Sequence, residues 1–394
     1  MSNDLLSIAG VRSSSIASGI KQNGALDLSL ISLIEGSVTA GVFTQNVFCA
    51  APVLAAKNHL SHDVRALLIN SGNANAGTGE QGLKRSYDSC EIFAEKLAIK
   101  PQQVMPFSTG VIGQLLPLEP FQNNANTLVE DLAVENMSEV SQGILTTDLV
   151  KKCASASFAV NGTTVCISGI AKGSGMIRPD MATMLSFIVT DIGATQNELQ
   201  SCLTSGTNQS FNRITVDGDT STNDACTLSA TNQSGVQLSD CADAFQQALD
   251  SVMQTLAHKI VRDGEGATKF VETQASGLLT SEDCLEVAYT VAHSPLVKTA
   301  LFASDANWGR ILAAVGRARV DNLGIENINI YLNDLPIITA GEPDVNYTEE
   351  AGSAEMEKID IVIRIEMGQS STRESVWTTD FSYDYVKINA EYRS

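Results

Sequence analysis

The sequence lacks several features that would assign it to a class of protein at once. No apolar run approaches the roughly 18 residues of a membrane-spanning helix, and the first twenty residues contain no basic head followed by an apolar run. We therefore expect neither a spanning protein nor a secretory signal, and expect a cytoplasmic location. Basic side chains are scarce: 25 Lys and Arg face 45 Asp and Glu, and the net charge of −20 disfavours nucleic acid as a partner.

Signatures of familiar catalytic and metal sites are also missing. The chain contains no HExxH, no CxxC pair, no GxSxG elbow and no Walker loop. Its four histidines stand apart in sequence, so we expect no metal site. Its eight cysteines are scattered without framework spacing, which is typical of free thiols in a reducing compartment.

The segments that are present alternate between strand and helix patterns. With 394 residues, 43% of them hydrophobic, the chain can bury two lobes or one large layered domain. Apolar, β-branched runs predict strands at 163–171, 184–192 and 359–367, and a hairpin at 328–339 turning at Asn333. Three- and four-residue spacing predicts helices at 86–99, at 195–211 and from Asp240 onward. A mixed α/β fold of sheets covered by helices follows.

Two polar segments leave their role open. The segment 70–82, NSGNANAGTGEQG, is either a loop whose backbone N–H groups cradle an anion or a plain loop that needs positive φ. The acidic segment 216–224, VDGDTSTND, has no glutamate at the twelfth position of a calcium loop that starts at Asp217. We interpret it as a structural, hydrogen-bonded loop.

Thr183 follows a glycine- and proline-containing loop and begins an apolar strand, in GSGMIRPDMATMLSF. A threonine there is either an ordinary strand residue or a nucleophile. An N-terminal threonine carries its own base, since the α-amine titrates near pH 7.7 to 8.0. That chemistry requires cleavage of the Ala182–Thr183 bond, by attack of the Thr183 hydroxyl on the Ala182 carbonyl, into an alpha chain 1–182 and a beta chain 183–394.

Motifs along essentially the whole chain resemble the ornithine acetyltransferase family, the bifunctional glutamate N-acetyltransferases of arginine biosynthesis. The segment AKGSGMIRPDMATMLSFIVTDI is similar to the family's self-processing segment. Further matches are FTQNVFCAAPV, LLINSGNANAGTG, FSTGVIG, SFNRITVDGDTSTNDA, VRDGEGATKF, SDANWGRILAAVGRA and WTTDFSYDYVKINAEYRS. The resemblance implies a layered αββα sandwich like that of the N-terminal-nucleophile fold, with a smaller C-terminal α/β lobe within about 275–394.

The resemblance also implies a role for individual residues. Thr183 matches the nucleophile that is freed by cleavage after Ala182, and Thr109 and Gly110 match the pair that stabilises the oxyanion. The positions that match the family's substrate contacts are Thr146, Lys172, Thr183, Glu265, Asn389 and Ser394. Ser394 stands where many relatives have threonine, and it keeps the hydroxyl.

The implied reaction moves an acetyl group from N2-acetylornithine to glutamate through an acetyl-threonine intermediate. It needs no cofactor or metal, although some family members also take acetyl-CoA as donor, and the family implies a heterotetramer of two alpha and two beta chains. Two alternatives remain open: an N-terminal-threonine amidase or aminopeptidase in which water is the acceptor, and a non-catalytic protein that binds a small molecule.

Overall fold

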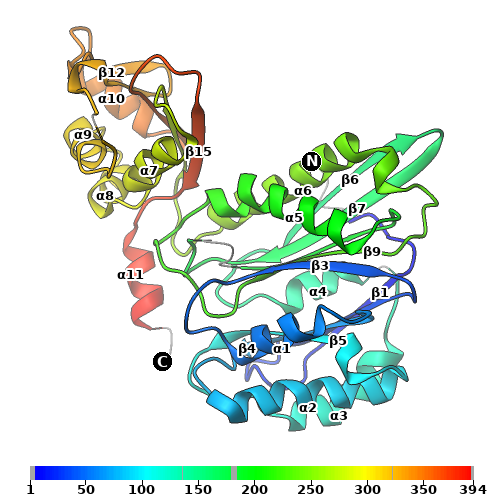
Figure 1. The fold of residues 1–394 in the computed structure, drawn as a ribbon. Coiled ribbons are helices and arrows are strands. Elements are labelled where there is room, and N and C mark those ends of the chain that lie inside the picture. Colours follow the sequence, from blue (N-terminus) through cyan, green and yellow to red (C-terminus); the bar gives the residue numbers. More distant parts are fainter. Residues whose placement is uncertain (1–4, 135, 179–183, 322, 392–394) are drawn as a thin grey trace. The chain divides into compact units, whose positions relative to one another are not determined.

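A computed structural model describes residues 5–134, 136–178, 184–321 and 323–391. The chain divides into two compact units, and Figure 1 shows the elements of each. The first unit comprises Met1–Asn212 and Asp219–Ile260, and the second comprises Arg213–Gly218 and Val261–Ser394. The predicted nucleophile Thr183, its neighbour Ala182 and the terminal Ser394 lie outside the described residues.

Two mixed sheets form the centre of the first unit. One has the order β1-β2-β4-β5, with a parallel pair β4/β5 and otherwise antiparallel neighbours. Its strands are β1 (Val11–Ile16), β2 (Leu28–Leu33), β4 (Ala66–Asn73) and β5 (Val104–Val111). The other has the order β3-β9-β8-β7-β6, with a parallel pair β8/β9. Its strands are β3 (Val38–Phe43), β6 (Lys152–Val160), β7 (Thr163–Lys172), β8 (Leu185–Thr190) and β9 (Ala225–Ala230).

The two sheets pack face to face because their strands are apolar on both sides. In β4, Leu67 and Ile69 belong to the core between the sheets, whereas Leu68, which points to the opposite face, belongs to a second core beneath the helices. Phe107 of β5 meets Phe187 of β8 edge to face, with ring centroids 5.0 Å apart. This aromatic pair joins the two sheets directly.

Helices cover the outer faces of both sheets, as Figure 1 shows for the first unit. Phe93 of α2 (Gly79–Leu97) and Phe121 of α3 (Glu119–Glu130) pack in the outer core of the first sheet. The second sheet is covered by α5 (Gln196–Gln209) and α6 (Ala242–Arg262), and Phe158 of β6 packs against Phe245 of α6. The shorter helices α1 (Ala51–His59) and α4 (Met137–Gly143) contribute to the core between the sheets.

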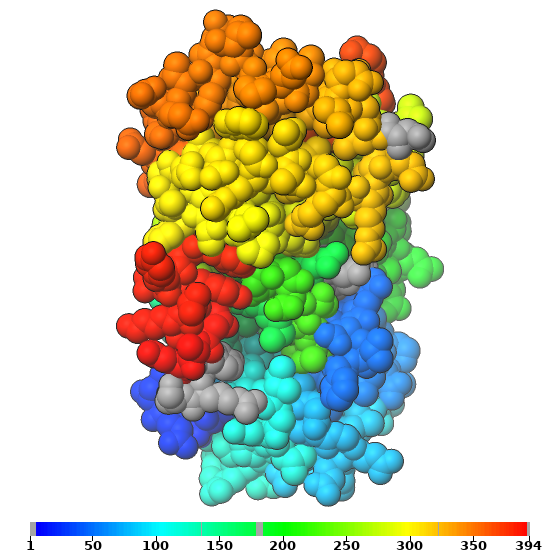
Figure 2. All heavy atoms as spheres, turned by 90° about the vertical axis from the view of Figure 1, so that its left-hand side faces the viewer, coloured from blue at the N-terminus to red at the C-terminus, as the bar shows by residue number. Residues whose placement is uncertain are grey.

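The second unit is a smaller α/β layer. Its sheet has the order β13-β12-β11-β14-β10-β15, in which β10 and β14 are parallel. The strands are β10 (Phe270–Ser276), β11 (Asn329–Leu332), β12 (Leu335–Thr339), β13 (Glu342–Pro343), β14 (Asp360–Glu366) and β15 (Arg373–Thr378). The helices are α7 (Ser281–Ala292), α8 (Pro295–Phe302), α9 (Trp308–Gly316), α10 (Glu349–Met356) and α11 (Tyr383–Ala390). Figure 2 shows the yellow surface formed by α7 to α9 and the red surface that includes α11.

The layered α/β architecture expected from the sequence is confirmed, and so are the predicted elements. β7, β8 and β14 lie where apolar runs predict strands, and β11 and β12 form the predicted hairpin with Asn333 at positive φ of 51°. α5 begins with the capping box of Thr195 and Glu198. Its side-chain and backbone hydrogen bonds satisfy donors that the first helical turn leaves free.

The structure bears out the positive φ expected in the segment 70–82, at Gly72, Asn75, Gly77 and Gly79, but most of the segment is not a loop. Its first residues end β4, and its last residues begin α2, seven residues before the helix that the apolar spacing predicts at Ser86. Gly82 tolerates no side chain, because a Cβ there would lie 1.8 Å from Thr78 Oγ1. The Asn75 amide donates to Gly82 O at 2.9 Å and to Ser86 Oγ at 3.0 Å, so close packing explains the glycine.

All eight cysteines are free thiols in this structure. Within the described ranges, no helix combines the length and apolar character needed to cross a bilayer.

Candidate active site

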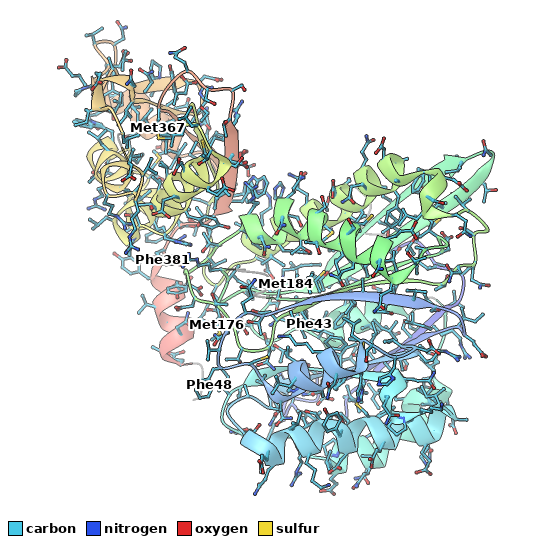
Figure 3. All side chains as sticks on the ribbon, in the orientation of Figure 1. Phe43, Phe48, Met176, Met184, Met367 and Phe381 are labelled. Carbon is cyan, nitrogen blue, oxygen red and sulfur yellow. The ribbon has the colours of Figure 1, made fainter. Side chains whose placement is uncertain are left out.

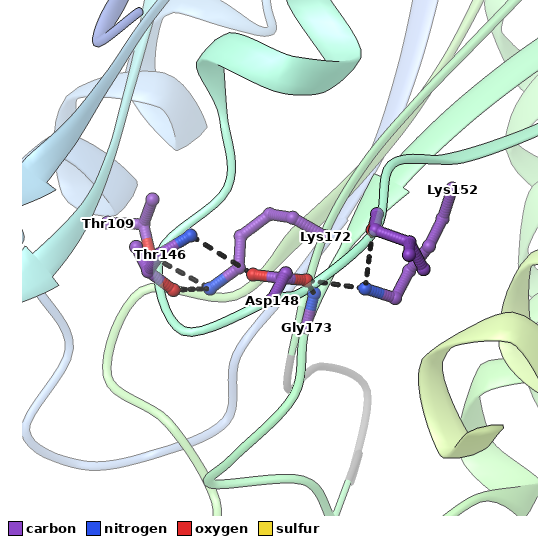
Figure 4. Close-up of polar contacts among 7 residues, drawn as sticks. Thr109, Thr146, Asp148, Lys152, Lys172 and Gly173 are labelled. Carbon is purple, nitrogen blue, oxygen red and sulfur yellow. Dashed lines mark hydrogen bonds and ion pairs between the residues drawn. The ribbon is translucent and has the colours of Figure 1, made fainter. Parts of the chain in front are cut away.

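Lys172 forms hydrogen bonds with two other predicted site residues. It is the last residue of β7, and its Nζ donates to Thr109 Oγ1 and to Thr146 Oγ1, at 3.1 Å in each case (Figure 4). Because β7 and β5 belong to the two facing sheets, the site lies where the ends of these strands meet. The sequence separations of 63 and 26 residues show that the tertiary fold assembles this cluster.

The ammonium group also determines what the two hydroxyls can do. A lysine ammonium only donates, so it occupies a lone pair of each threonine oxygen. The O–H of Thr109 and of Thr146 then remains available to donate to another group. Two hydroxyl donors beside a fixed positive charge favour an oxyanion or a substrate carboxylate.

Gly110 lies beside Thr109 at the end of β5 and cannot carry a side chain. Its φ is +132°, and a Cβ there would lie 2.3 Å from the carbonyl carbon of Gly72 in β4. Asn223 fixes the same strand end, since its Nδ2 donates to Ser108 O at 2.9 Å and to Ala74 O at 2.6 Å. The backbone around Thr109 and Gly110 is therefore held rigidly, as a preorganised oxyanion site requires.

Asp148 is a buried carboxylate in the centre of this cluster that the sequence analysis missed. It accepts hydrogen bonds from Lys152 Nζ at 2.7 Å, from Gly173 N at 2.7 Å and from Thr146 N at 3.1 Å (Figure 4). The side chains of Asp148 and Lys152 are both 0% exposed. The four-residue spacing of these two residues is the only signal in the sequence, and it resembles an ordinary helical surface pair.

The surroundings of Asp148 keep it ionised. Burial by itself would raise the pKa of Asp148, but the charges of Lys172 and Lys152 and the hydrogen bonds from Lys152 and Gly173 lower it to about 2. A fixed carboxylate thus anchors the Thr146 backbone and the first residue after β7.

Asp224 is a second buried carboxyl that the sequence analysis did not single out. It precedes β9, is 3% exposed, and is hydrogen-bonded by Ser221 and by the backbone N–H of Met184. Burial raises the pKa of Asp224 well above its ordinary value, and the Ser221 hydrogen bond and the Lys172 charge oppose this only in part. Asp148 and Asp224 therefore have opposite protonation preferences.

Met184 is the first described residue after the predicted cleavage point. It is 3% exposed, and its carbonyl accepts the N–H of Ala225 at 3.0 Å. Figure 3 labels its side chain in the first unit. On the other side of the loop, a Cβ on Gly173 would lie 3.4 Å from Met184 Cβ. The two ends of the segment 174–183 are thus held close together, Gly173 through Asp148 and Met184 through Asp224.

The second unit brings together two other predicted residues. Asn389 of α11 donates from Nδ2 to Glu265 Oε2 at 2.8 Å, and the Glu265 residue is 6% exposed. Asp380 fixes the two segments that carry this pair, because it accepts the N–H groups of Thr268 at 2.8 Å and Lys269 at 2.9 Å. A buried carboxylate paired with an amide is suited to an ammonium group of a substrate.

Among the described residues no group of three or more His, Cys, Asp or Glu is arranged to hold a metal. The start of α2 lines a surface pocket of about 520 Å³. Its lining residues are Val47, Phe48, Cys49, Ala51, Leu54, Gly77, Thr78, Gly79, Glu80 and Leu83. These residues are mostly apolar and include a carboxylate but no basic side chain, which disfavours an anion there.

Comparisons relate the chain to known proteins. The ArgJ family profile matches residues 12–394. The arginine biosynthesis bifunctional protein ArgJ of Pseudomonas syringae pv. tomato (strain ATCC BAA-871 / DC3000) is 49% identical over 96% of this chain and 95% of its own. Its counterpart from Pseudomonas fluorescens (strain Pf0-1) is 48% identical over 98% and 97%. A crystal structure of ornithine acetyltransferase complexed with ornithine from Mycobacterium tuberculosis is 31% identical, covers 47% of this chain and 97% of its own, and has a TM-score of 0.41.

Proposed function

The chain belongs to the ArgJ family, as its motifs predict, and from this premise we propose that it moves the acetyl group of N2-acetylornithine to glutamate. It is an acyltransferase of arginine biosynthesis, and its relatives carry the name bifunctional protein. The hydrogen bonds from Lys172 to Thr109 and Thr146 are the observation that carries the proposed site. They join a predicted oxyanion residue to two predicted substrate contacts.

The proposed cycle begins with self-processing. The Thr183 hydroxyl attacks the Ala182 carbonyl, the acyl group moves from nitrogen to oxygen, and water hydrolyses the resulting ester. The chain is then divided into residues 1–182 and 183–394, and Thr183 has a free α-amine that titrates near neutral pH. This amine serves as the base for the Thr183 hydroxyl in every later turnover.

Acetyl transfer follows in two half-reactions. The Thr183 oxygen attacks the acetyl carbonyl of N2-acetylornithine, an acetyl-threonine ester forms, and ornithine leaves. The amine of glutamate then attacks the ester and gives N-acetylglutamate. Each step passes through a tetrahedral oxyanion, which the Thr109 hydroxyl and the Gly110 N–H stabilise. The Lys172 charge adds a favourable field at the same place.

The predicted substrate contacts in each unit have a different chemistry. Lys172 and the Thr146 hydroxyl suit a carboxylate, whereas Glu265 with Asn389 suits an ammonium group, and Ser394 adds a hydroxyl. The chemistry uses protein groups alone, and acetyl-CoA is an additional donor to be tested. We further propose a cytoplasmic heterotetramer of two alpha and two beta chains.

Product analysis tests this function. The protein is incubated with N2-acetylornithine that carries a labelled acetyl group, with and without glutamate, and the products are separated by mass spectrometry. The proposal predicts labelled N-acetylglutamate that forms only when glutamate is present. Labelled free acetate as the main product in the presence of glutamate would instead identify an amidase. A parallel reaction with acetyl-CoA and glutamate decides whether the second donor is used.

A further inference from the structure

Asp224 has an oxygen that the fold leaves without a partner. Among the described residues, Asp224 Oδ2 makes no hydrogen bond, although the atom is buried and the residue is only 3% exposed. An unsatisfied buried carboxyl oxygen destabilises the folded state. A buried polar group of this kind needs a physical reason, and a role in chemistry is one such reason.

The position of Asp224 links it to the bond that the proposed processing breaks. Its carboxyl accepts the N–H of Met184, the residue directly after Thr183. In the sequence, this N–H follows the Thr183 nitrogen by one residue, so the hydrogen bond ties Asp224 to the residue directly after the bond that would break. Asn223, the preceding residue, bonds to Ser108 O beside Thr109, which ties the same loop to the proposed oxyanion site.

The chemical form of the carboxyl fits a proton donor. Burial raises the pKa of Asp224, whereas the hydrogen bonds from Ser221 and Met184 and the positive charge of Lys172 lower it in part. A neutral carboxyl carries one O–H, and Oδ2 is the oxygen with no partner in the described part of the chain. Asp148, by contrast, is held ionised. In many active sites, one carboxyl with a raised pKa acts as the acid while a second carboxyl stays ionised.

We propose that Asp224 donates the proton that the Thr183 nitrogen needs when the Ala182–Thr183 bond breaks. This inference rests on the proposed self-processing. In the acyl shift the Thr183 oxygen forms a bond to the Ala182 carbonyl carbon, and the bond from that carbon to the Thr183 nitrogen breaks. Asp224 gives its proton to the departing nitrogen and takes up the proton that the Thr183 hydroxyl loses. The net change moves one proton from oxygen to nitrogen, and Asp224 ends as it began.

An isosteric substitution separates this role from a structural one. In Asp224→Asn, the side-chain amide keeps the shape and the acceptor for the Met184 N–H, but it cannot transfer a proton. Asp191→Asn is the matched control: Asp191 lies just past the other end of β8, is 8% exposed, and accepts the N–H of Cys166 at 3.0 Å. Burial raises the pKa of Asp191 too. The two substitutions therefore remove similar carboxyls, one just after the end of β8 and one beside its start.

The experiment follows cleavage in newly made protein. Wild type, Asp224→Asn, Asp191→Asn and Thr183→Ala are produced by cell-free translation, quenched at intervals in denaturant, and assayed by intact mass. We expect wild type and Asp191→Asn to be cut at similar rates and Asp224→Asn to be cut at least about 100-fold more slowly, the usual contribution of general acid catalysis. Cleavage of Asp224→Asn at the wild-type rate would overturn the proposal. An uncut wild-type chain would overturn self-processing itself, and with it this role.

A measurement on the wild type needs no variant and covers the case in which Asp224→Asn does not fold. The cleavage rate is measured between pH 5 and 10, while circular dichroism monitors the fold. A required neutral acid predicts that the rate falls as the pH passes the raised pKa of Asp224. A rate that keeps rising to pH 10 in folded protein would contradict a proton donated by Asp224.

Discussion

The ammonium nitrogen of Lys172 lies 3.1 Å from the hydroxyl oxygen of Thr109, so the O–H of that threonine is free to donate. In Thr109→Val the shape is kept and the donor is lost. We expect kcat for acetyl transfer to fall by about 100-fold, the effect of removing an oxyanion-hole donor. Thr109→Ser keeps the hydroxyl and is expected to stay within about tenfold of wild type. Steady-state kinetics on fully cleaved protein measures both, and equal losses in the two variants would contradict this role.

The Asp148–Lys152 pair is wholly buried, so removal of one partner leaves an uncompensated charge in the interior. In Asp148→Asn the Lys152 ammonium loses its partner, and we expect the free energy of unfolding to fall by about 3 kcal/mol. The matched control is Asp88→Asn, which breaks the exposed pair of Lys84 and Asp88 at the same four-residue spacing. Its expected effect is below about 0.5 kcal/mol. Urea unfolding at neutral pH compares the two, and equal effects would refute the argument from burial.

The same pair predicts a pH dependence. The pKa of Asp148 is lowered to about 2 in the folded protein, below its value in the unfolded chain. Its contribution to stability is therefore complete above about pH 4 and is lost as the pH falls toward 2. The difference in unfolding free energy between wild type and Asp148→Asn should shrink over this range. A difference that stays constant from pH 5 to the lowest pH at which both proteins fold would contradict the assignment.

Lys298 predicts a rise of stability with pH in a higher pH range. It is fully buried, donates to Thr378 Oγ1 at 2.8 Å, and burial lowers its pKa to about 7 against the partial opposition of Asp380 and Asp217. Between pH 7 and the unfolded value of 10.5 the unfolded chain binds the extra proton, so stability rises with pH. Relative to wild type, Lys298→Met should lose about 2 kcal/mol of the rise between pH 7 and 9.

Urea unfolding of Lys298→Met and wild type at the two pH values tests this. Lys358→Met is the control, because Lys358 lies in the same unit but is paired at the surface with Glu355. If all three proteins gain the same stability between pH 7 and 9, Lys298 is not the group that titrates.

Glu265 and Asn389 are expected to act in substrate binding. Glu265→Gln keeps a hydrogen-bonding side chain beside Asn389 but removes the charge that an ammonium group would meet. We expect KM to rise by about 10- to 100-fold with a smaller change in kcat, since a hydrogen bond to a charged group contributes about 1.5 to 3 kcal/mol. Glu272→Gln, in β10 of the same unit, is the control. An unchanged KM in Glu265→Gln would show that the Glu265 charge does not bind the substrate.

The sequence predicts those parts of the fold in which local and tertiary preferences agree. β7 and β8 are apolar and β-rich, and α5 opens with a complete capping box, so their patterns identify them. The start of α2 escapes such analysis, because Gly79 and Gly82 are poor helix formers. Gly82 is required there by close contact with Thr78, which only the folded chain reveals.

The sequence also predicts only some of the residues of the candidate site. Thr109, Thr146 and Lys172 are predicted from motifs, and their hydrogen bonds bring them together. Asp148 and Asp224 are not predicted, because their burial and partners depend on segments distant in sequence. No local pattern distinguishes a buried aspartate held ionised from one held neutral.

The central claim is that Thr183 becomes an N-terminal nucleophile, and intact mass measurement tests it most directly. Freshly purified wild type and Thr183→Ala are compared under denaturing conditions, before and after addition of N2-acetylornithine. We predict two fragments, 1–182 and 183–394, in the wild type and one full-length chain in Thr183→Ala. Added donor should increase the mass of the 183–394 fragment by one acetyl group. A single uncut wild-type chain that never gains an acetyl group would contradict the account.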